Sequence, residues 1–207
     1  MSDSCCSHTP TNRNPRYHAI LWIALAVNAA MFLVEIIASA ASGSAALAGD
    51  AVDFAGDAAN YALSLAAMAA GGLWTSRAAL AKGVSMGAYG TGVLVYAAWR
   101  LWLGAPPEPM TMGIVGMLAL ATNLGVAWLL YAYRNGDANM RSVWLCTRND
   151  AISNLAVLVA AAGVFSTSSV WPDVAVAAIM ATLALSSARS VVAHALGELR
   201  VNAARSA

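Results

Sequence analysis

Long apolar stretches, each bounded by a few charged residues, run along most of the chain. Six of them contain no Asp, Glu, Lys or Arg over 15 to 25 residues. A helix that crosses a bilayer needs about 20 mostly apolar residues, and the shorter stretches reach this length by including one charged residue. The pattern therefore predicts six transmembrane helices, over 18–41, 46–70, 82–103, 110–133, 142–165 and 173–194.

The composition supports a membrane protein and argues against several other classes. Apolar residues make up 60% of the 207 residues and charged residues only 10%, whereas soluble domains carry about a quarter charged residues. The net charge of +1 gives no electrostatic basis for binding nucleic acid. Three cysteines, two of them adjacent, form no disulfide framework.

The basic residues are distributed unevenly between the two ends of the predicted helices. If the N-terminus is cytoplasmic, nine of the eleven Lys and Arg residues lie at cytoplasmic helix ends. The positive-inside rule then places both termini in the cytoplasm. We therefore expect an all-α integral membrane protein in a bacterial inner (plasma) membrane. Residues 1–17 and 196–207 would be cytoplasmic tails, and 18–195 a six-helix bundle.

Three carboxylates in the predicted helix 46–70 lie on one face. At 100° per residue, Asp50, Asp53 and Asp57 fall with Asn60 and Ser64 within an arc of about 80°. Each carboxylate near the bilayer centre costs about 2.5–3.5 kcal/mol on insertion scales, so such residues are usually functional. The face is expected to point into the bundle.

The predicted helix 142–165 has a similar polar face, formed by Cys146, Asn149, Asp150, Ser153 and Asn154. Side chains four residues apart are neighbours on a helix, as are Asp53 and Asp57 on one helix and Cys146 and Asp150 on the other. Two such pairs on facing helices would offer four groups to one metal ion. Oxygen and sulfur ligands in a tetrahedron suit Zn²⁺ and related ions. We expect these two pairs to be the metal ligands.

Other polar residues of the predicted helices are candidates for accessory positions around the ligands. Asp50 lies one turn outward from Asp53, where it would serve ion entry or exit, or cap the helix. Glu35 would carry protons, support the ligands or pair with a structural partner such as Asn123. Asn149 and Asn154 flank the predicted ligand Asp150 on its helix.

Two features lie outside these polar faces. In the N-terminal tail, Cys5, Cys6 and His8 are close enough in sequence to capture a soft metal ion, although such short clusters also occur by chance. Asp173 follows Pro172 at the start of the last predicted helix, where a carboxylate stabilises the helix N-terminus. We expect Asp173 to be a helix cap.

The motifs resemble the cation diffusion facilitator family of transporters. Residues 42–57, SGSAALAGDAVDFAGD, are similar to its second helix, whose hallmark is a His or Asp, three residues, then Asp; residues 145–154, LCTRNDAISN, are similar to its fifth helix. Arg100-Leu101 before Pro106-Pro107-Glu108-Pro109, and Trp171-Pro172-Asp173, are similar too. The resemblance covers residues 18 to 195. It implies six helices, cytoplasmic termini and a homodimer.

The chain departs from the family pattern in ways that bear on the ion and on assembly. Cys146 stands where the family usually has His or Asp, and a thiolate favours softer ions such as Zn²⁺, Cd²⁺ or Cu(I). The sequence contains neither the cytoplasmic metal-binding domain that usually follows the sixth helix nor a His-rich loop between the fourth and fifth. Dimer contacts would then involve membrane helices, for example through Gly83 and Gly87, whose spacing permits close helix packing.

The function expected from these observations is export of a divalent cation, Zn²⁺ first and Cd²⁺, Co²⁺ or Fe²⁺ as alternatives. The chain has no Gly-x-x-x-x-Gly-Lys-Ser/Thr motif for ATP, so proton antiport is the expected energy source. A metal-sensing or accessory subunit that binds without transporting is the alternative. No nucleophile and base pair lies beside the carboxylates, so we expect no enzyme activity, and no resident cofactor.

Overall fold

The computed structural model describes the backbone of residues 15–69, 72–133 and 138–206, and the side chains of 15–66, 76–133, 147 and 150–201. These residues form six α helices and no strand. The helices are α1 (Pro15–Ser42), α2 (Ala45–Ala69), α3 (Gly72–Leu103), α4 (Pro109–Tyr131), α5 (Ala138–Thr167) and α6 (Trp171–Ser206). An all-helical chain of six helices agrees with the sequence pattern.

Several helices are longer than the apolar pattern predicts. α3 begins at Gly72, ten residues before the predicted start, and α6 continues through residues 196–206, which were expected to be a tail. Charged residues mark where contact with lipid ends, but they do not stop a helix. The predicted ranges therefore correspond to the apolar parts of longer helices.

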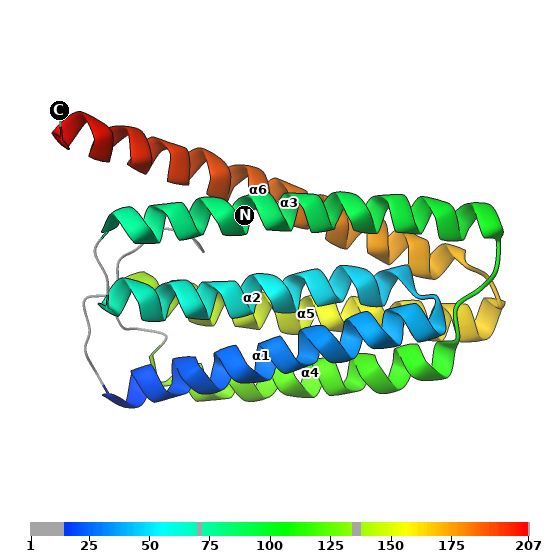
Figure 1. Cartoon of the computed structure of the whole chain (residues 1–207). Helices are drawn as coiled ribbons and strands as arrows, with labels where there is room; N and C mark the ends of the chain where they lie inside the picture. Colours follow the sequence, from blue (N-terminus) through cyan, green and yellow to red (C-terminus); the bar gives the residue numbers. More distant parts are fainter. Residues whose placement is uncertain (1–14, 70–71, 134–137, 207) are drawn as a thin grey trace.

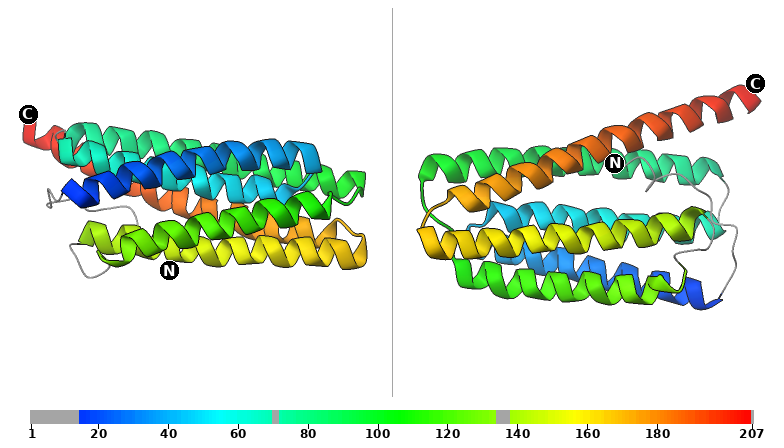
Figure 2. Two further views of the ribbon diagram at one scale, coloured as in Figure 1. Left: turned by 90° about the horizontal axis from the view of Figure 1, so that it is seen from below. Right: turned by 180° about the vertical axis from the view of Figure 1, so that it is seen from behind.

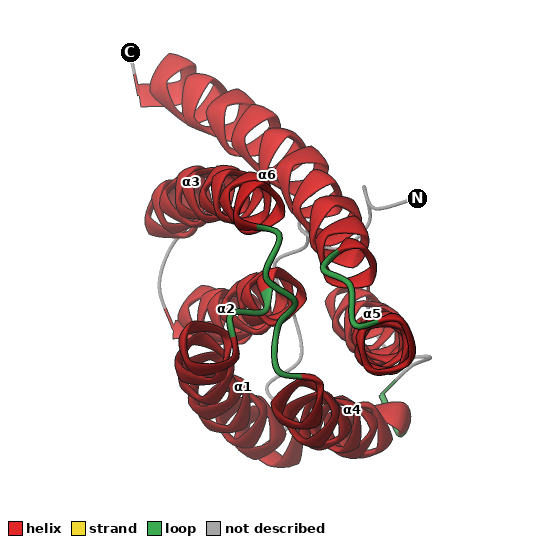
Figure 3. Ribbon diagram, turned by 90° about the vertical axis from the view of Figure 1, so that its right-hand side faces the viewer, coloured by secondary structure: helices red, strands yellow, loops and turns green. Residues whose placement is uncertain are grey.

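The helices lie side by side, with α2 in the interior (Figures 1 and 3). α2 packs against α1, α3, α5 and α6, while α3 pairs closely with α6 and α4 with α5. The views from below and behind in Figure 2 show α6 crossing the bundle obliquely and projecting beyond it. Because α2 is surrounded by other helices, its polar side chains face them.

The described helix ends fall into two groups at opposite ends of the bundle (Figure 1). The start of α1 and the end of α6 lie at one end, and the connections from α1 to α2, α3 to α4 and α5 to α6 lie at the other. The two ends of the described chain thus lie at the same end of the bundle.

Four helical segments among the described residues are long and apolar enough to cross a membrane. They are Pro15–Ser42, Pro109–Tyr131, Asp150–Thr167 and Trp171–Val201. α2 and α3 do not qualify; α2 carries three aspartates, and α3 is rich in glycine and small polar residues of low hydropathy. A multi-pass membrane protein follows from the four qualifying segments.

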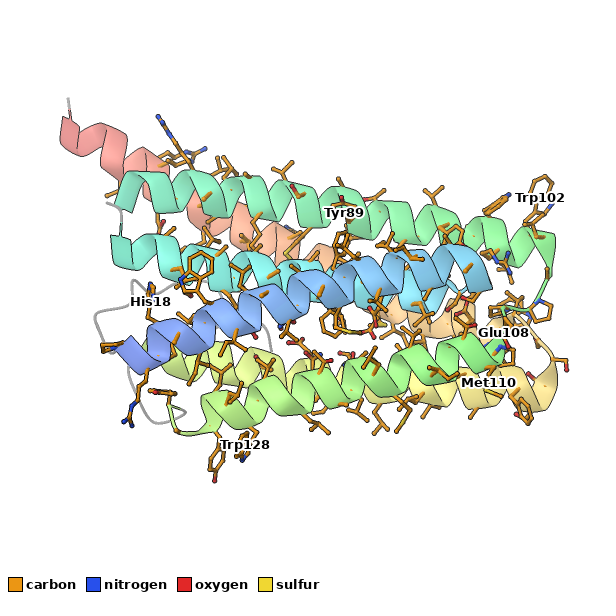
Figure 4. The ribbon with its side chains drawn as sticks, turned by 60° about the horizontal axis from the view of Figure 1, so that its bottom comes forward. His18, Tyr89, Trp102, Glu108, Met110 and Trp128 are labelled. Atoms are coloured by element: carbon orange, nitrogen blue, oxygen red, sulfur yellow. The ribbon has the colours of Figure 1, made fainter. Side chains whose placement is uncertain are left out.

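Large apolar side chains cover the outside of the bundle. Ile37, Trp128 and Phe165 are 68%, 77% and 74% exposed. In Figure 4, Trp128 protrudes from α4 toward the end where His18 lies, and Trp102 protrudes from α3 at the other end, where Glu108 also lies. An apolar exterior with aromatic residues near both ends suits a surface in contact with lipid and its interfaces.

Asp173 caps a helix, but not the one expected from the sequence. Its Oδ1 accepts hydrogen bonds from the Ser44 hydroxyl (2.6 Å) and the Ala46 N–H (3.0 Å), and its Oδ2 from the Ala45 N–H (2.8 Å). These donors form the first turn of α2, whose N–H groups have no partner within their own helix. The start of α6 is therefore attached to the start of α2.

The turn that leads into α2 depends on Gly43. Its φ of +72° is a left-handed conformation that side chains with a Cβ rarely adopt. The guanidinium group of Arg100 lies 2.5–2.7 Å from where a Cβ would stand. Arg100 Nη2 also donates to the carbonyl of Ala105 (2.9 Å). This tight corner fixes where α2 begins relative to α3.

Candidate metal centre

The polar face of α2 points into the bundle, as the spacing predicts. Asp50 is fully buried, Asp57 is 6% exposed and Asp53 is half-buried. Ser64, at the other end of the same face, is also buried. Because α2 is surrounded by other helices, its carboxylates lie within reach of side chains from several of them.

The central contact joins α2 to α5. The carboxyl groups of Asp57 and Asp150 interact directly, and Asp53 lies within electrostatic range of both. Asp150 lies on α5, which packs against α2. The structure therefore brings three of the four predicted ligands into one region.

Tyr61 and Thr147, which no sequence motif singled out, connect the two helices beside these carboxylates. The Tyr61 hydroxyl and Thr147 Oγ1 are 2.7 Å apart, and the same hydroxyl donates a long hydrogen bond of 3.5 Å to Asp57 Oδ2. Both side chains are buried. Tyr61 follows Asp57 by four residues, so helical periodicity could have assigned it to the polar face.

A positive charge lies on the α3 side of this region. Lys82 is only 8% exposed, and its ammonium group donates a hydrogen bond to Asn60 Oδ1 on α2. Its charge acts on Asp57. Lys82 is the first residue of the predicted helix 82–103, whereas the structure places it ten residues inside α3 with its side chain directed into the bundle.

A second pair of carboxylates lies toward the end of the bundle where α2 begins. Glu35 of α1 and Asp50 of α2 are fully buried and interact with each other, and Asp53 also acts on Glu35. Among the described residues, none donates a hydrogen bond to the carboxylate oxygens of either residue. Glu35 therefore faces the polar face of α2 directly.

Asparagine side chains from three helices are buried as well. Asn28 donates to the carbonyl of Ala24 (2.8 Å), whereas its own Oδ1 has no partner in the described part of the chain. Asn123 Oδ1 and both polar side-chain atoms of Asn154 also have no hydrogen-bond partner among the described residues. Buried polar atoms are usually satisfied, so these groups show that the interior is polar beyond the predicted ligands.

Some predicted site residues lie outside the part that the structure describes. This holds for Cys5, Cys6 and His8, and for the side chains of Cys146 and Asn149. Within the described side chains, no three His, Cys, Asp or Glu residues are grouped closely enough to hold a metal ion in the arrangement seen.

A family comparison bears on the same helices. The profile of the cation efflux transmembrane domain matches residues 74–199. This chain belongs to the cation efflux family. The members of this cation efflux family are transporters of metal cations, not enzymes. No curated protein matches the chain.

The match to the cation efflux family covers α3 to α6 and so includes Lys82, Thr147 and Asp150. It does not extend to α2, which carries Asp53 and Asp57. The assignment of these two residues as candidate metal ligands therefore depends on the geometry of the polar face and on their interactions with Asp150.

Proposed function

We propose that the protein is a secondary transporter that exports a divalent cation from the cytoplasm in exchange for protons. Zn²⁺ is the first cargo, with Cd²⁺, Co²⁺ and Fe²⁺ as further ones. The observation that carries this proposal is the meeting of Asp57 of α2 with Asp150, which lies within the matched cation efflux domain, with Asp53 beside them. Cys146 would supply the fourth ligand.

Exchange for protons follows from the chemistry of such ligands. Carboxylates and a thiolate bind metal in their deprotonated forms, so metal binding expels protons and protonation weakens metal binding. Metal that arrives from the cytoplasm would displace protons, and protons that enter from the other side would release it. Glu35 and Asp50 lie toward the opposite end and would extend this proton path.

The topology that fits this function has six membrane crossings, with both termini in the cytoplasm of a bacterial cell, and a homodimer as the functional unit. Gly83 and Gly87 do not supply a free dimer face. A Cβ at Gly83 would lie 2.8 Å from Val192 Cγ2, and one at Gly87 3.7 Å from Ala188 Cβ, so both glycines face α6 of the same chain. Dimer contacts would therefore use other surfaces.

Uptake by proteoliposomes tests the function. An indicator inside the vesicles reports Zn²⁺ entry when a pH gradient is imposed. We expect uptake to depend on the gradient and to be lost in Asp57→Asn. The control is Glu108→Gln, which alters an exposed carboxylate at the end of the bundle (Figure 4) and should leave uptake intact.

Two results would contradict the proposal. Uptake that is indifferent to both the gradient and Asp57→Asn would exclude transport through this site. Zn²⁺ binding that depends on Asp57, without any uptake, would instead support a metal-sensing or accessory subunit.

The role of Cys146 can be tested separately. Cys146→His should preserve transport and shift preference toward Zn²⁺ over softer ions, because imidazole is a harder ligand than thiolate. Cys146→Ala should weaken metal binding less than Asp57→Ala or Asp150→Ala. If Cys146→Ala transports every ion as the wild type does, the site is built from carboxylates alone.

A further inference from the structure

Lys82 is an unusual residue for the interior of a membrane helix bundle. Its side chain is 8% exposed, although an ammonium group strongly favours water. Charged residues inside membrane proteins usually pair with one another and belong to ion pathways. The burial of Lys82 beside α2 therefore indicates a function for its charge.

Two contacts fix the position of Lys82 relative to the candidate site. Its ammonium group donates to Asn60 Oδ1, one turn from Asp57 on the polar face of α2. Met86, one turn further along α3, packs against Gly56; its Cε lies 3.4 Å from where a Cβ would stand. Lys82 and Met86 thus contact α2 on either side of the level of Asp57.

The carboxylates at this level need a balancing charge. Asp53, Asp57 and Asp150 act on one another, and burial makes repulsion between like charges strong. The ammonium group of Lys82 acts on Asp57 with the opposite sign. A lysine head group is a compact charge on a flexible four-carbon stem, so it can approach the carboxylates or withdraw from them.

We propose that Lys82 is a tethered counter-cation of the transport site. Without metal, its charge balances the carboxylates around Asp57; an arriving divalent cation competes with it and displaces it. The competition weakens metal binding enough to allow release, since transport requires an ion to bind and also to leave. This proposal rests on the transport site described under Proposed function.

Metal affinity distinguishes this role from a structural one. The purified full-length protein in detergent is titrated with Zn²⁺ against a chelating indicator. Lys82→Gln removes the charge but keeps a polar group that can reach Asn60. We expect its Kd for Zn²⁺ to fall roughly tenfold, with slower metal release, because a nearby positive charge has been removed. Lys82→Arg keeps the charge and should stay near the wild-type Kd.

Asn60→Ala is the matched control. It removes the same hydrogen bond but keeps the charge of Lys82. If Lys82 only joined α3 to α2 through this hydrogen bond, Asn60→Ala would change Zn²⁺ binding, whereas Lys82→Gln would leave it near the wild-type value. The proposal instead predicts tighter binding in Lys82→Gln alone. In vesicles, Lys82→Gln should lower the KM for Zn²⁺ and also lower kcat, because release becomes slower.

Several outcomes would overturn the proposal. A Kd in well-folded Lys82→Gln that is unchanged or higher contradicts competition. Lys82→Met is a second neutral variant, and failure of both to fold would show that the charge serves the fold. If the wild type binds no Zn²⁺, or Asp57→Asn binds it equally well, the transport site itself is wrong. If only the Lys82 results fail, the transport site stands.

Discussion

The contact between Asp173 and the first turn of α2 gives a sharp prediction about stability. Asp173→Ala removes three hydrogen bonds of 2.6–3.0 Å and leaves the N–H groups of Ala45 and Ala46 without their acceptor in a fully buried position. Each unsatisfied buried N–H costs about 1–3 kcal/mol, so the free energy of unfolding should fall by about 2–6 kcal/mol. Loss of these hydrogen bonds between the start of α6 and the start of α2 should also lower Zn²⁺ uptake.

Unfolding in mixed micelles with increasing SDS, followed by circular dichroism, measures this loss. Asp173→Asn keeps one carbonyl oxygen as acceptor and should give a smaller loss than Asp173→Ala. The control is Glu108→Ala, which removes an exposed carboxylate that caps α4. A loss below about 1 kcal/mol in Asp173→Ala would refute the reasoning, because the first turn of α2 would then have another partner.

Three further predictions concern the corners and the interior. Tyr61→Phe removes the hydroxyl that joins α2 to α5 and should lower the free energy of unfolding by about 1 kcal/mol in the same SDS titration. Gly43→Ala places a Cβ at a φ of +72° and against Arg100, and should lower it by about 1–2 kcal/mol; no loss would mean that the turn relaxes easily. Hydrogen bonds from Thr111 and Met110 hold the pKa of Glu108 in the folded protein below its usual 4.5. The stability that the Glu108 carboxylate adds is therefore complete above pH 4.5, and it is lost as the pH falls through the lower pKa of the folded protein. The Tm difference between wild type and Glu108→Gln should therefore be constant near neutral pH and shrink below about pH 4.5; a difference that grows in acid would contradict the sign.

The number of helices and the direction of the α2 polar face could be predicted from the sequence. Both depend on local periodicity: charge-free stretches have the length of a membrane helix, and 100° per residue places Asp50 and Asp57 on one side. The meeting of Asp57 with Asp150 was anticipated from two similar polar faces. The ends of α3 and α6 could not be predicted, because the length of an apolar stretch reflects the thickness of the membrane, and both helices extend beyond their apolar stretches.

The remaining errors involve partners that are distant in the sequence. Asp173 was assigned to its own helix because capping rules consider neighbouring residues, whereas Ser44, its actual partner, is 129 positions away. Lys82 stands at the edge of an apolar stretch, as the first residue of the predicted helix 82–103, so its burial against α2 could not be predicted. Its long stem carries the ammonium group toward Asn60, and only the packing of α3 against α2 determines that direction.

The length of α6 has a mechanical consequence. At 1.5 Å per residue, its 36 residues extend about 54 Å, while the hydrocarbon layer is about 30 Å thick. About 24 Å of helix therefore stands outside this layer as a continuous rod, linked to α3 by the hydrogen bond from Ser76 to Glu198. A tilt of about 10° at the bilayer centre would swing its tip by about 7 Å. Any tilt of α6 inside the membrane would therefore give a larger displacement at its C-terminal end.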